Sequence, residues 1–145
     1  ENNYCLELEE LGVMINDYVP VSEIDRVYES SDILLHVESF DKNIIPFTKY
    51  SLSTKIPEYM ASGKPLLAYL PIVLYGYNYI DERKVGLVAS NKNELKKKIE
   101  VLVYNEGLRK RLAENGLYYA KKEHSISVVK ENLRIALETS CQNRI

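Results

Sequence analysis

The stretch that decides the fold runs from Ser53 to Ala68 and reads STKIPEYMASGKPLLA. It predicts a short helix over residues 54–62, in which Thr54 is the N-cap and its side-chain oxygen accepts a first-turn N–H. Pro57 then falls in the first turn, where its missing N–H costs no intrahelical hydrogen bond. Gly63 predicts the helix end, since glycine readily adopts the left-handed conformation found there. The apolar run that follows predicts a short buried strand.

Two charged side chains mark the start of this helix. Lys55 follows the N-cap, and Glu58 lies one turn into the helix. A helix N-terminus and a lysine both attract anions, so this position suits a phosphate group, to which Ser53 and Thr54 can also contribute. A nearby carboxylate suits the hydroxyl groups of a sugar. The pattern therefore predicts a site for a sugar nucleotide.

The rest of the chain alternates predicted strands and helices. This alternation predicts an α/β fold with a doubly wound, mostly parallel, Rossmann-like sheet and helices on both faces. Short apolar runs predict strands at residues 13–15, 33–37, 65–69 and 86–89. Apolar periodicity predicts helices at residues 3–11, where Gly12 ends the helix, and from residue 22 onward, where Ser22 is the cap. Further helices are predicted at residues 93–104, 106–122 and 125–140, and residues 73–84 are helical or irregular.

In such sheets, ligands bind beyond the carboxyl ends of the strands. Four loops are expected along that rim, namely residues 18–20, 38–42, 53–58 and 70–75. We therefore expect Val19, Pro20 and Glu38 to bind substrate together with Ser53, Thr54 and Glu58.

Composition restricts the classes of protein that fit. The chain has 145 residues, 46% of them hydrophobic and 28% charged, which suits one globular domain. A net charge of −2 argues against binding nucleic acid by bulk electrostatics. Cys5 and Cys141 lack metal-ligand spacing, so we expect no metal site, no disulfide and a cytoplasmic location. The lysines at 96–98 predict a solvated helix face, with contact to an anionic membrane as the alternative.

The histidines and a tyrosine cluster have structural interpretations. His36 lies in an apolar strand, so we expect a hydrogen-bonded core residue, and a role at the binding site, suggested by its position near the strand end, is the alternative. We expect His124 on the surface. We expect the rings of Tyr75, Tyr77 and Tyr79 to pack on a half-buried part of the surface. The alternative is that they stack on a ligand.

The segment around Glu58 resembles the C-terminal, donor-binding half of retaining GT-B-type glycosyltransferases of the group 1 family. The signature of that family is a helix reading roughly Glu-Ala/Tyr-Met/Leu-Ala-Ser/Cys-Gly-Lys-Pro-Val/Leu, and residues 58–67 match it almost without a gap. Three further segments are similar to the family in the same order, namely residues 24–37, 85–88 and 105–112.

The resemblance implies transfer of a hexose from a nucleoside diphosphate sugar to a hydroxyl group, without a cofactor or a tightly bound metal. Glu58 would contact the ribose, and Lys55 would stabilise the leaving diphosphate. Many members have another glutamate eight positions before this one, which contacts the sugar, but this chain has Tyr50 there. Glu38 is the nearest earlier acid at a strand end, at a different spacing.

The resemblance also implies that residues 1–145 form a single nucleotide-sugar-binding domain, a fragment of a two-domain enzyme. The first strand, its diphosphate-binding loop and the N-terminal acceptor-binding domain are absent from this sequence, so we expect the chain alone to be inactive. Two alternatives remain open, namely a sugar-nucleotide epimerase of the same architecture and a non-catalytic α/β interaction module, which the Tyr50 departure slightly favours.

Overall fold

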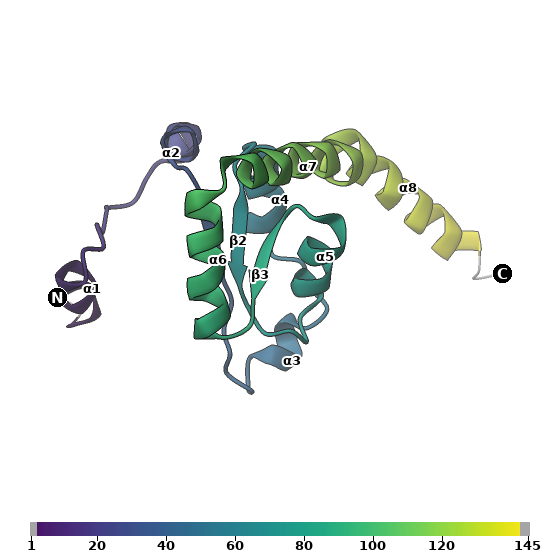
Figure 1. The fold of residues 1–145 in the computed structure, drawn as a ribbon. Coiled ribbons are helices and arrows are strands. Elements are labelled where there is room, and N and C mark those ends of the chain that lie inside the picture. Colours follow the sequence, from purple (N-terminus) through teal and green to yellow (C-terminus); the bar gives the residue numbers. More distant parts are fainter. Residues whose placement is uncertain (1–2, 143–145) are drawn as a thin grey trace.

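The computed structural model describes residues 3–142 and confirms an α/β fold with a parallel sheet flanked by helices (Figure 1). The strands are β1 (Leu34–Val37), β2 (Leu66–Tyr69) and β3 (Gly86–Ala89), and they lie in that order across the sheet. Leu66 is in register with Leu34 on one side and with Gly86 on the other. β2 is therefore the central strand of the described sheet, and its first three residues are buried.

The helices occur close to the predicted positions. They are α1 (Asn3–Glu10), the 3-10 helix η1 (Val21–Glu23), α2 (Ile24–Ser30), α3 (Ile45–Thr48), α4 (Lys55–Ala61), α5 (Tyr75–Arg83), α6 (Lys92–Tyr104), α7 (Glu106–His124) and α8 (Ile126–Gln142). The segment predicted as helical or irregular forms α5, and the loop before α4 contains the single turn of α3. No helix in the described part of the chain is long and apolar enough to span a membrane.

Side chains on the two faces of the sheet form two cores. On one face, Leu66 and Ala68 of β2 pack in a cluster with Ile56 and Met60 of α4 and Ile80 of α5. On the opposite face, the cluster joins Leu67 of β2, Leu102 of α6 and Leu112 of α7. Residues of α7 contribute to both clusters, and Figure 1 shows this helix running along one end of the sheet. The alternating side chains of β2 therefore explain why helices cover both faces.

Gly63 ends α4 as predicted, in a backbone conformation with φ of +71°. A β-carbon at this position would lie 3.3 Å from a methyl group of Leu117 on α7. Gly116, the residue before Leu117 on α7, faces the backbone of Met60, and a β-carbon there would lie 3.4 Å from that backbone. Glycines on both sides of the contact thus let α4 and α7 approach closely, which fixes the position of α4.

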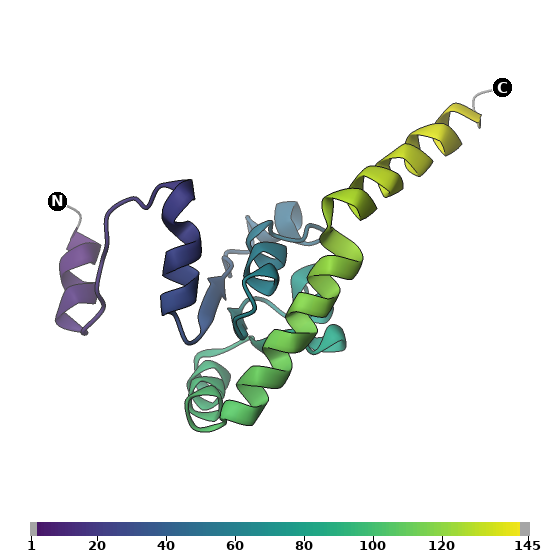
Figure 2. The same ribbon diagram turned by 90° about the horizontal axis from the view of Figure 1, so that it is seen from above.

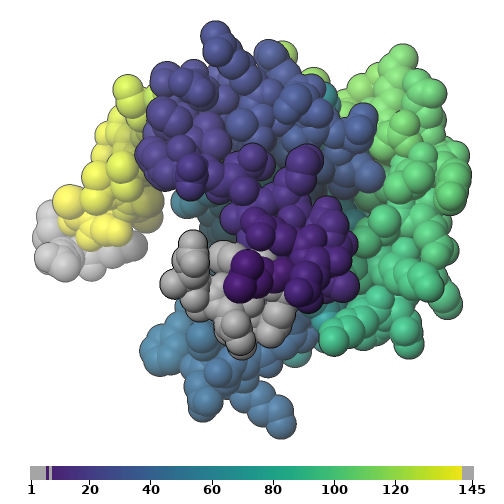
Figure 3. Space-filling view, turned by 90° about the vertical axis from the view of Figure 1, so that its left-hand side faces the viewer, coloured from purple at the N-terminus to yellow at the C-terminus, as the bar shows by residue number. Residues whose placement is uncertain are grey.

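Two predictions for the first third of the chain are wrong. Residues 13–15 form no strand, and they are exposed. A strand is defined by pairing, and no described segment pairs with them, so their apolar character alone is insufficient. Ser22 caps no helix, because it lies inside η1, and the residue that precedes α2 is Glu23, without a side-chain cap. Figure 3 views the molecule from the side on which α1 and these residues lie.

A polar cluster connects α5 to the end of α7. The Tyr79 hydroxyl lies 3.0 Å from Oε2 of Glu123 and 2.7 Å from Nε2 of His124. The arrangement that satisfies all three groups has the hydroxyl donating to the carboxylate and the imidazole donating to the hydroxyl oxygen. Arg83 donates to Glu123 at 3.0 Å and lies 4.1 Å from the Tyr79 ring centre. His124, predicted on the surface, is therefore partly buried, because α7 packs its last turn against α5.

This environment predicts a pH-dependent stability. Burial lowers the pKa of His124 below its ordinary value of 6.5, and nearby Arg83 also lowers it, against the opposing effect of Glu123. The unfolded chain then binds a proton more readily, so stability is fully present above pH 6.5 and falls as the pH decreases below it. We expect the wild-type melting temperature to decrease between pH 7 and 5.5, and His124→Gln to decrease less. Equal decreases in the two proteins would contradict this role for His124.

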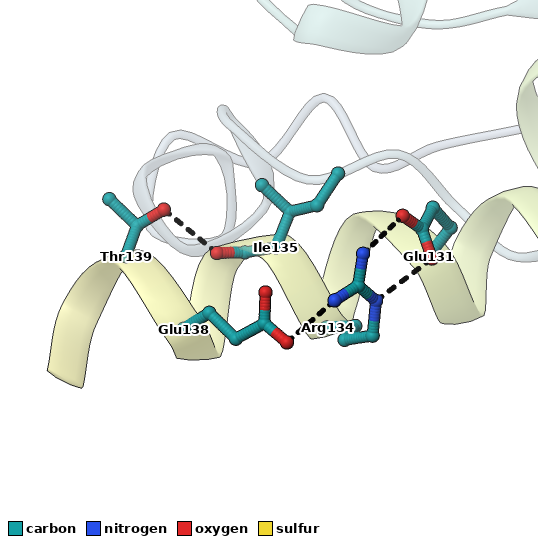
Figure 4. A network of polar contacts seen from close by, with 5 residues as sticks. All are labelled: Glu131, Arg134, Ile135, Glu138 and Thr139. Atoms are coloured by element: carbon teal, nitrogen blue, oxygen red, sulfur yellow. Dashed lines mark hydrogen bonds and ion pairs between the residues drawn. The ribbon is translucent and has the colours of Figure 1, made fainter. Parts of the chain in front are cut away.

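Helix α8 projects away from the sheet (Figures 1 and 2). Arg134 lies between two glutamates and donates to Glu131 at 2.7 Å and to Glu138 at 2.6 Å (Figure 4). The apolar side chains of α8 are exposed, among them Ile126, Val129, Leu133 and Leu137. The ion pairs join residues one turn apart, so they stabilise the helix itself and do not fix it against the sheet.

Candidate functional site

Glu58, the central residue of the predicted site, is held by two neighbours. The Tyr28 hydroxyl of α2 donates to Oε1 of Glu58 at 2.5 Å. The Lys55 ammonium donates to Oε2 at 3.0 Å, from one turn earlier on α4. The Glu58 side chain remains 35% exposed. The carboxylate is thus fixed in orientation and still open to a ligand.

These contacts set the charge of the site. The hydrogen bond from Tyr28 lowers the pKa of Glu58, and Lys55 lowers it further, while partial burial opposes both effects. Burial and the same hydrogen bond raise the pKa of Tyr28. At neutral pH Glu58 is therefore an anion and Tyr28 a neutral donor. A carboxylate offers about four lone-pair positions, so the two described donors leave room for hydroxyl groups of a ligand.

Glu58 borders a groove between α2 and α4 of about 320 Å³. Its lining combines apolar and polar side chains and consists of Val21, Ile24, Asp25, Tyr28, Glu58, Ala61 and Ser62. A second hollow of about 430 Å³ lies on the other side of Glu58, between α4 and the junction of α7 with α8. The carboxylate oxygen held by Tyr28 lies toward α2, so the groove between α2 and α4 is the candidate site.

The start of α4 differs from the prediction in one respect. Thr54 precedes the helix, but it has helical φ and ψ of −60° and −22°, and its side chain makes no capping hydrogen bond. The Ile56 N–H donates instead to the carbonyl of Ser53 at 3.0 Å. Since Pro57 has no N–H, few backbone donors remain at this end. Binding of an anion here would depend on the side chain of Lys55, together with the hydroxyls of Ser53 and Thr54.

The structure places the other predicted residues in two groups. Val19 and Pro20 immediately precede η1, whose first residue, Val21, borders the groove beside Glu58. Glu38 instead directly follows β1, and it accepts a hydrogen bond from His36. No hydrogen bond between described residues joins Glu38 to α4, so Glu38 and Glu58 are separate features of the candidate site.

The loop between β1 and α4 is held in place by backbone contacts. The Tyr75 N–H at the start of α5 donates to the carbonyl of Lys49 at 2.8 Å. The next residue, Tyr50, is 82% exposed, and the Lys49 ammonium lies 5.2 Å from its ring centre. Tyr50 therefore has no carboxylate with which to bind a sugar as the family's glutamate does, and its side chain is not part of the core.

Tyr28 is the residue that sequence reasoning missed, because it lies 30 residues before its partner Glu58. Its ring also packs against Tyr59, with ring centres 5.6 Å apart. Only the packing of α2 against α4 reveals this contact, and spacing along the chain gives no signal for it.

Among the described residues, no group of three or more His, Cys, Asp or Glu side chains is arranged to hold a metal ion.

Two comparisons with known proteins indicate the family of this chain. A family model described as glycosyl transferase-like matches residues 3–134. The chain is also 38% identical, over 86 residues, to a protein of Methanocaldococcus jannaschii named as an uncharacterized glycosyltransferase. That alignment covers 54% of this chain and 22% of the relative, so the chain spans less than a quarter of that protein. By its match over nearly its whole length, the chain belongs to the glycosyl transferase-like family.

Proposed function

We propose that this chain binds the nucleoside diphosphate part of a sugar nucleotide, as the donor-binding part of a glycosyltransferase that moves a hexose to a hydroxyl acceptor. The observation that carries the proposal is the Glu58 carboxylate, which Tyr28 and Lys55 orient at the edge of a groove. Family membership and the glycosyltransferase name of the relative support the reaction class.

In this proposal Glu58 accepts hydrogen bonds from the ribose hydroxyls. Its lowered pKa keeps it ionised near neutral pH, and hydrogen bonds to a charged acceptor are stronger than those to a neutral one. The apolar part of the groove, formed by Val21 and Ile24, suits the flat base. Val19 and Pro20 come just before this wall in the chain, and we propose that they extend it.

Lys55 is proposed to bind the diphosphate. Transfer breaks the bond between the sugar and the phosphate oxygen, and negative charge then develops on the leaving diphosphate. Lys55 is 47% exposed, and its pair with Glu58 joins residues three positions apart on a helix surface. Such exposed pairs are weak, so the ammonium can turn to a phosphate at little cost while Tyr28 keeps Glu58 in place.

The acceptor is proposed to bind to another part of the protein. The groove between α2 and α4 is assigned to the nucleotide in this proposal, so the acceptor needs a separate binding surface. We therefore propose an N-terminal acceptor-binding domain as partner and no turnover by residues 1–145 alone. A dependence of donor consumption on an acceptor alcohol would distinguish this function from that of an epimerase, which needs none.

Substitution of Lys55 tests the assignment of the phosphate. We expect the intact protein to bind a nucleoside diphosphate more tightly than the nucleoside, and Lys55→Met to remove most of that difference, because methionine keeps the bulk and loses the charge. Titration calorimetry of both ligands measures the difference. Added salt should weaken diphosphate binding to the wild type more than to the variant.

Lys84→Met is the matched control. Lys84 also pairs with an acid three positions away, Asp81, but it lies just before β3, at the amino end of the sheet. The control should leave both affinities unchanged. If Lys55→Met weakened nucleoside and diphosphate binding equally, Lys55 would be structural and the phosphate would have to bind elsewhere.

A further inference from the structure

His36 is an unusual residue for its position in β1. It is buried, at 7% exposure, and apart from tyrosines it is the one buried residue with a polar side chain among those that the structure describes. It lies in register with Ala68 of β2, and its strand neighbours Leu34, Leu35 and Val37 are apolar. An apolar side chain would fill this place without the cost of desolvating an imidazole. Packing alone therefore does not explain His36.

The imidazole has one described partner, the side chain of Glu38. Nε2 of His36 lies 3.0 Å from Oε1 of Glu38. Because an ionised carboxylate can only accept, Nε2 must carry the proton and donate it. The two residues are two positions apart along the strand direction, so their side chains extend to the same side of the sheet. This is the side on which α4 packs.

Glu38 is fixed at the edge where the parallel strands end. Its backbone N–H donates to the carbonyl of Tyr69, the last residue of β2, at 3.1 Å. Phe40, two residues later, packs on the Tyr69 ring with centres 4.6 Å apart. Both the backbone and the side chain of Glu38 are therefore held before any ligand arrives, which reduces the entropy cost of binding.

The second oxygen of this carboxylate is available to a ligand. The Glu38 side chain is 25% exposed, and none of the side chains that the structure describes forms a hydrogen bond with its Oε2. A buried donor thus holds one oxygen and leaves the other to accept from solvent or a ligand. Hydroxyl groups are the natural ligands of such an oxygen, whereas a phosphate would be repelled by it.

We propose that Glu38, positioned by His36, binds hydroxyl groups of the hexose carried by the nucleotide. The inference rests on the proposed function, in which the nucleotide binds at the start of α4. The start of α4 and the end of β1 lie at the same edge of the sheet, so one ligand could contact both. Glu58 and Lys55 then bind the nucleoside diphosphate, and Glu38 supplies a separate contact to the sugar. His36 does not touch the ligand and acts only as a positioning residue.

The test compares binding of nucleoside diphosphates with binding of their hexose derivatives by the intact protein. The probes are UDP and GDP and their glucose, galactose or mannose derivatives. For the pair that binds, the hexose should increase wild-type affinity. Glu38→Gln should reduce hexose-nucleotide affinity about ten- to hundredfold, the scale of a hydrogen bond to a charged group, and leave diphosphate affinity unchanged.

Two variants of His36 separate positioning from packing. His36→Leu fills the buried space and removes the donor, so this variant should lose most of the affinity that the hexose adds. His36→Gln places an amide N–H near the position of Nε2 and should restore most of it. Circular dichroism and thermal melting confirm that each variant is folded, and Glu38→Gln, at the partly exposed edge, tests the proposal independently of the buried substitutions.

The outcomes distinguish the inference from the function on which it rests. If the wild type binds none of the diphosphates or sugar nucleotides, the proposed function fails and this inference fails with it. If the diphosphate binds but the hexose adds no affinity, or its contribution survives Glu38→Gln, the inference alone is overturned. Equal loss in His36→Leu and His36→Gln would contradict the positioning role of His36.

Discussion

Gly86→Ala should destabilise the fold by about 3 kcal/mol or more, as expected for severe overpacking of a core. Gly86 begins β3 and is buried, in register with Leu66 of the central strand. A β-carbon there would lie 2.5 Å from the Leu66 carbonyl oxygen and 2.9 Å from the Leu66 β-carbon. Ile80 of α5 closes the remaining space at 3.1 Å. Since two of these atoms belong to the central strand, the clash cannot be relieved by turning a side chain.

Gly107→Ala is the control for this prediction. Gly107 lies in the first turn of α7, where the nearest atom to an added β-carbon is the Asn105 side-chain oxygen, 3.7 Å away. Alanine favours helix over glycine by up to about 1 kcal/mol, so this variant should be as stable as the wild type or slightly more stable. Urea unfolding measures both variants. A Gly86→Ala protein within about 1 kcal/mol of the wild type would contradict the described packing of β2 against β3.

Glu58→Ala should weaken binding of a nucleoside diphosphate sugar by about 1.5–3 kcal/mol, the scale for hydrogen bonds to a charged group. This corresponds to about a ten- to hundredfold increase in Kd. The loss should be nearly the same for the nucleoside without phosphate, because the proposed contact is to the ribose. Calorimetric titration of both ligands with the intact protein measures the loss.

Two variants serve as controls for Glu58→Ala. Tyr28→Phe keeps the ring that packs on Tyr59 and removes only the hydroxyl that donates to Glu58, so it should produce a smaller loss. Glu131→Ala removes another ion-paired helix glutamate, on α8, and should leave binding unchanged. An unchanged Kd in a folded Glu58→Ala protein would show that the ribose binds elsewhere.

The parts of the fold that the sequence predicted are those with strong local signals. Continuous apolar runs identified β1, β2 and β3, and Gly63 marked the end of α4 by a conformation that other residues rarely adopt. The strand predicted at residues 13–15 failed because strand formation depends on a partner, which a local pattern cannot supply. The Thr54 cap failed because the backbone before α4 is already helical, so its side chain is not placed to cap.

The candidate site was predictable in part for the same reason. Glu58 and Lys55 stood out because they share the first turn of one helix, and the structure joins them by an ion pair. Tyr28 lies on α2 and reaches Glu58 only through helix packing. His36 and Glu38 are two positions apart, so strand periodicity places them on the same face of the sheet. The burial of His36 could not be predicted in this way, because it depends on α4 covering that face.

The measurement that tests the central claim most directly is a crystal structure of the intact protein soaked with a nucleoside diphosphate that binds it in solution. The account predicts ribose hydroxyls within hydrogen-bonding distance of the Glu58 carboxylate, the base in the groove between α2 and α4, and a phosphate oxygen near the Lys55 ammonium. A nucleotide bound in the hollow between α4 and the junction of α7 with α8, or anywhere without contact to Glu58, would contradict it.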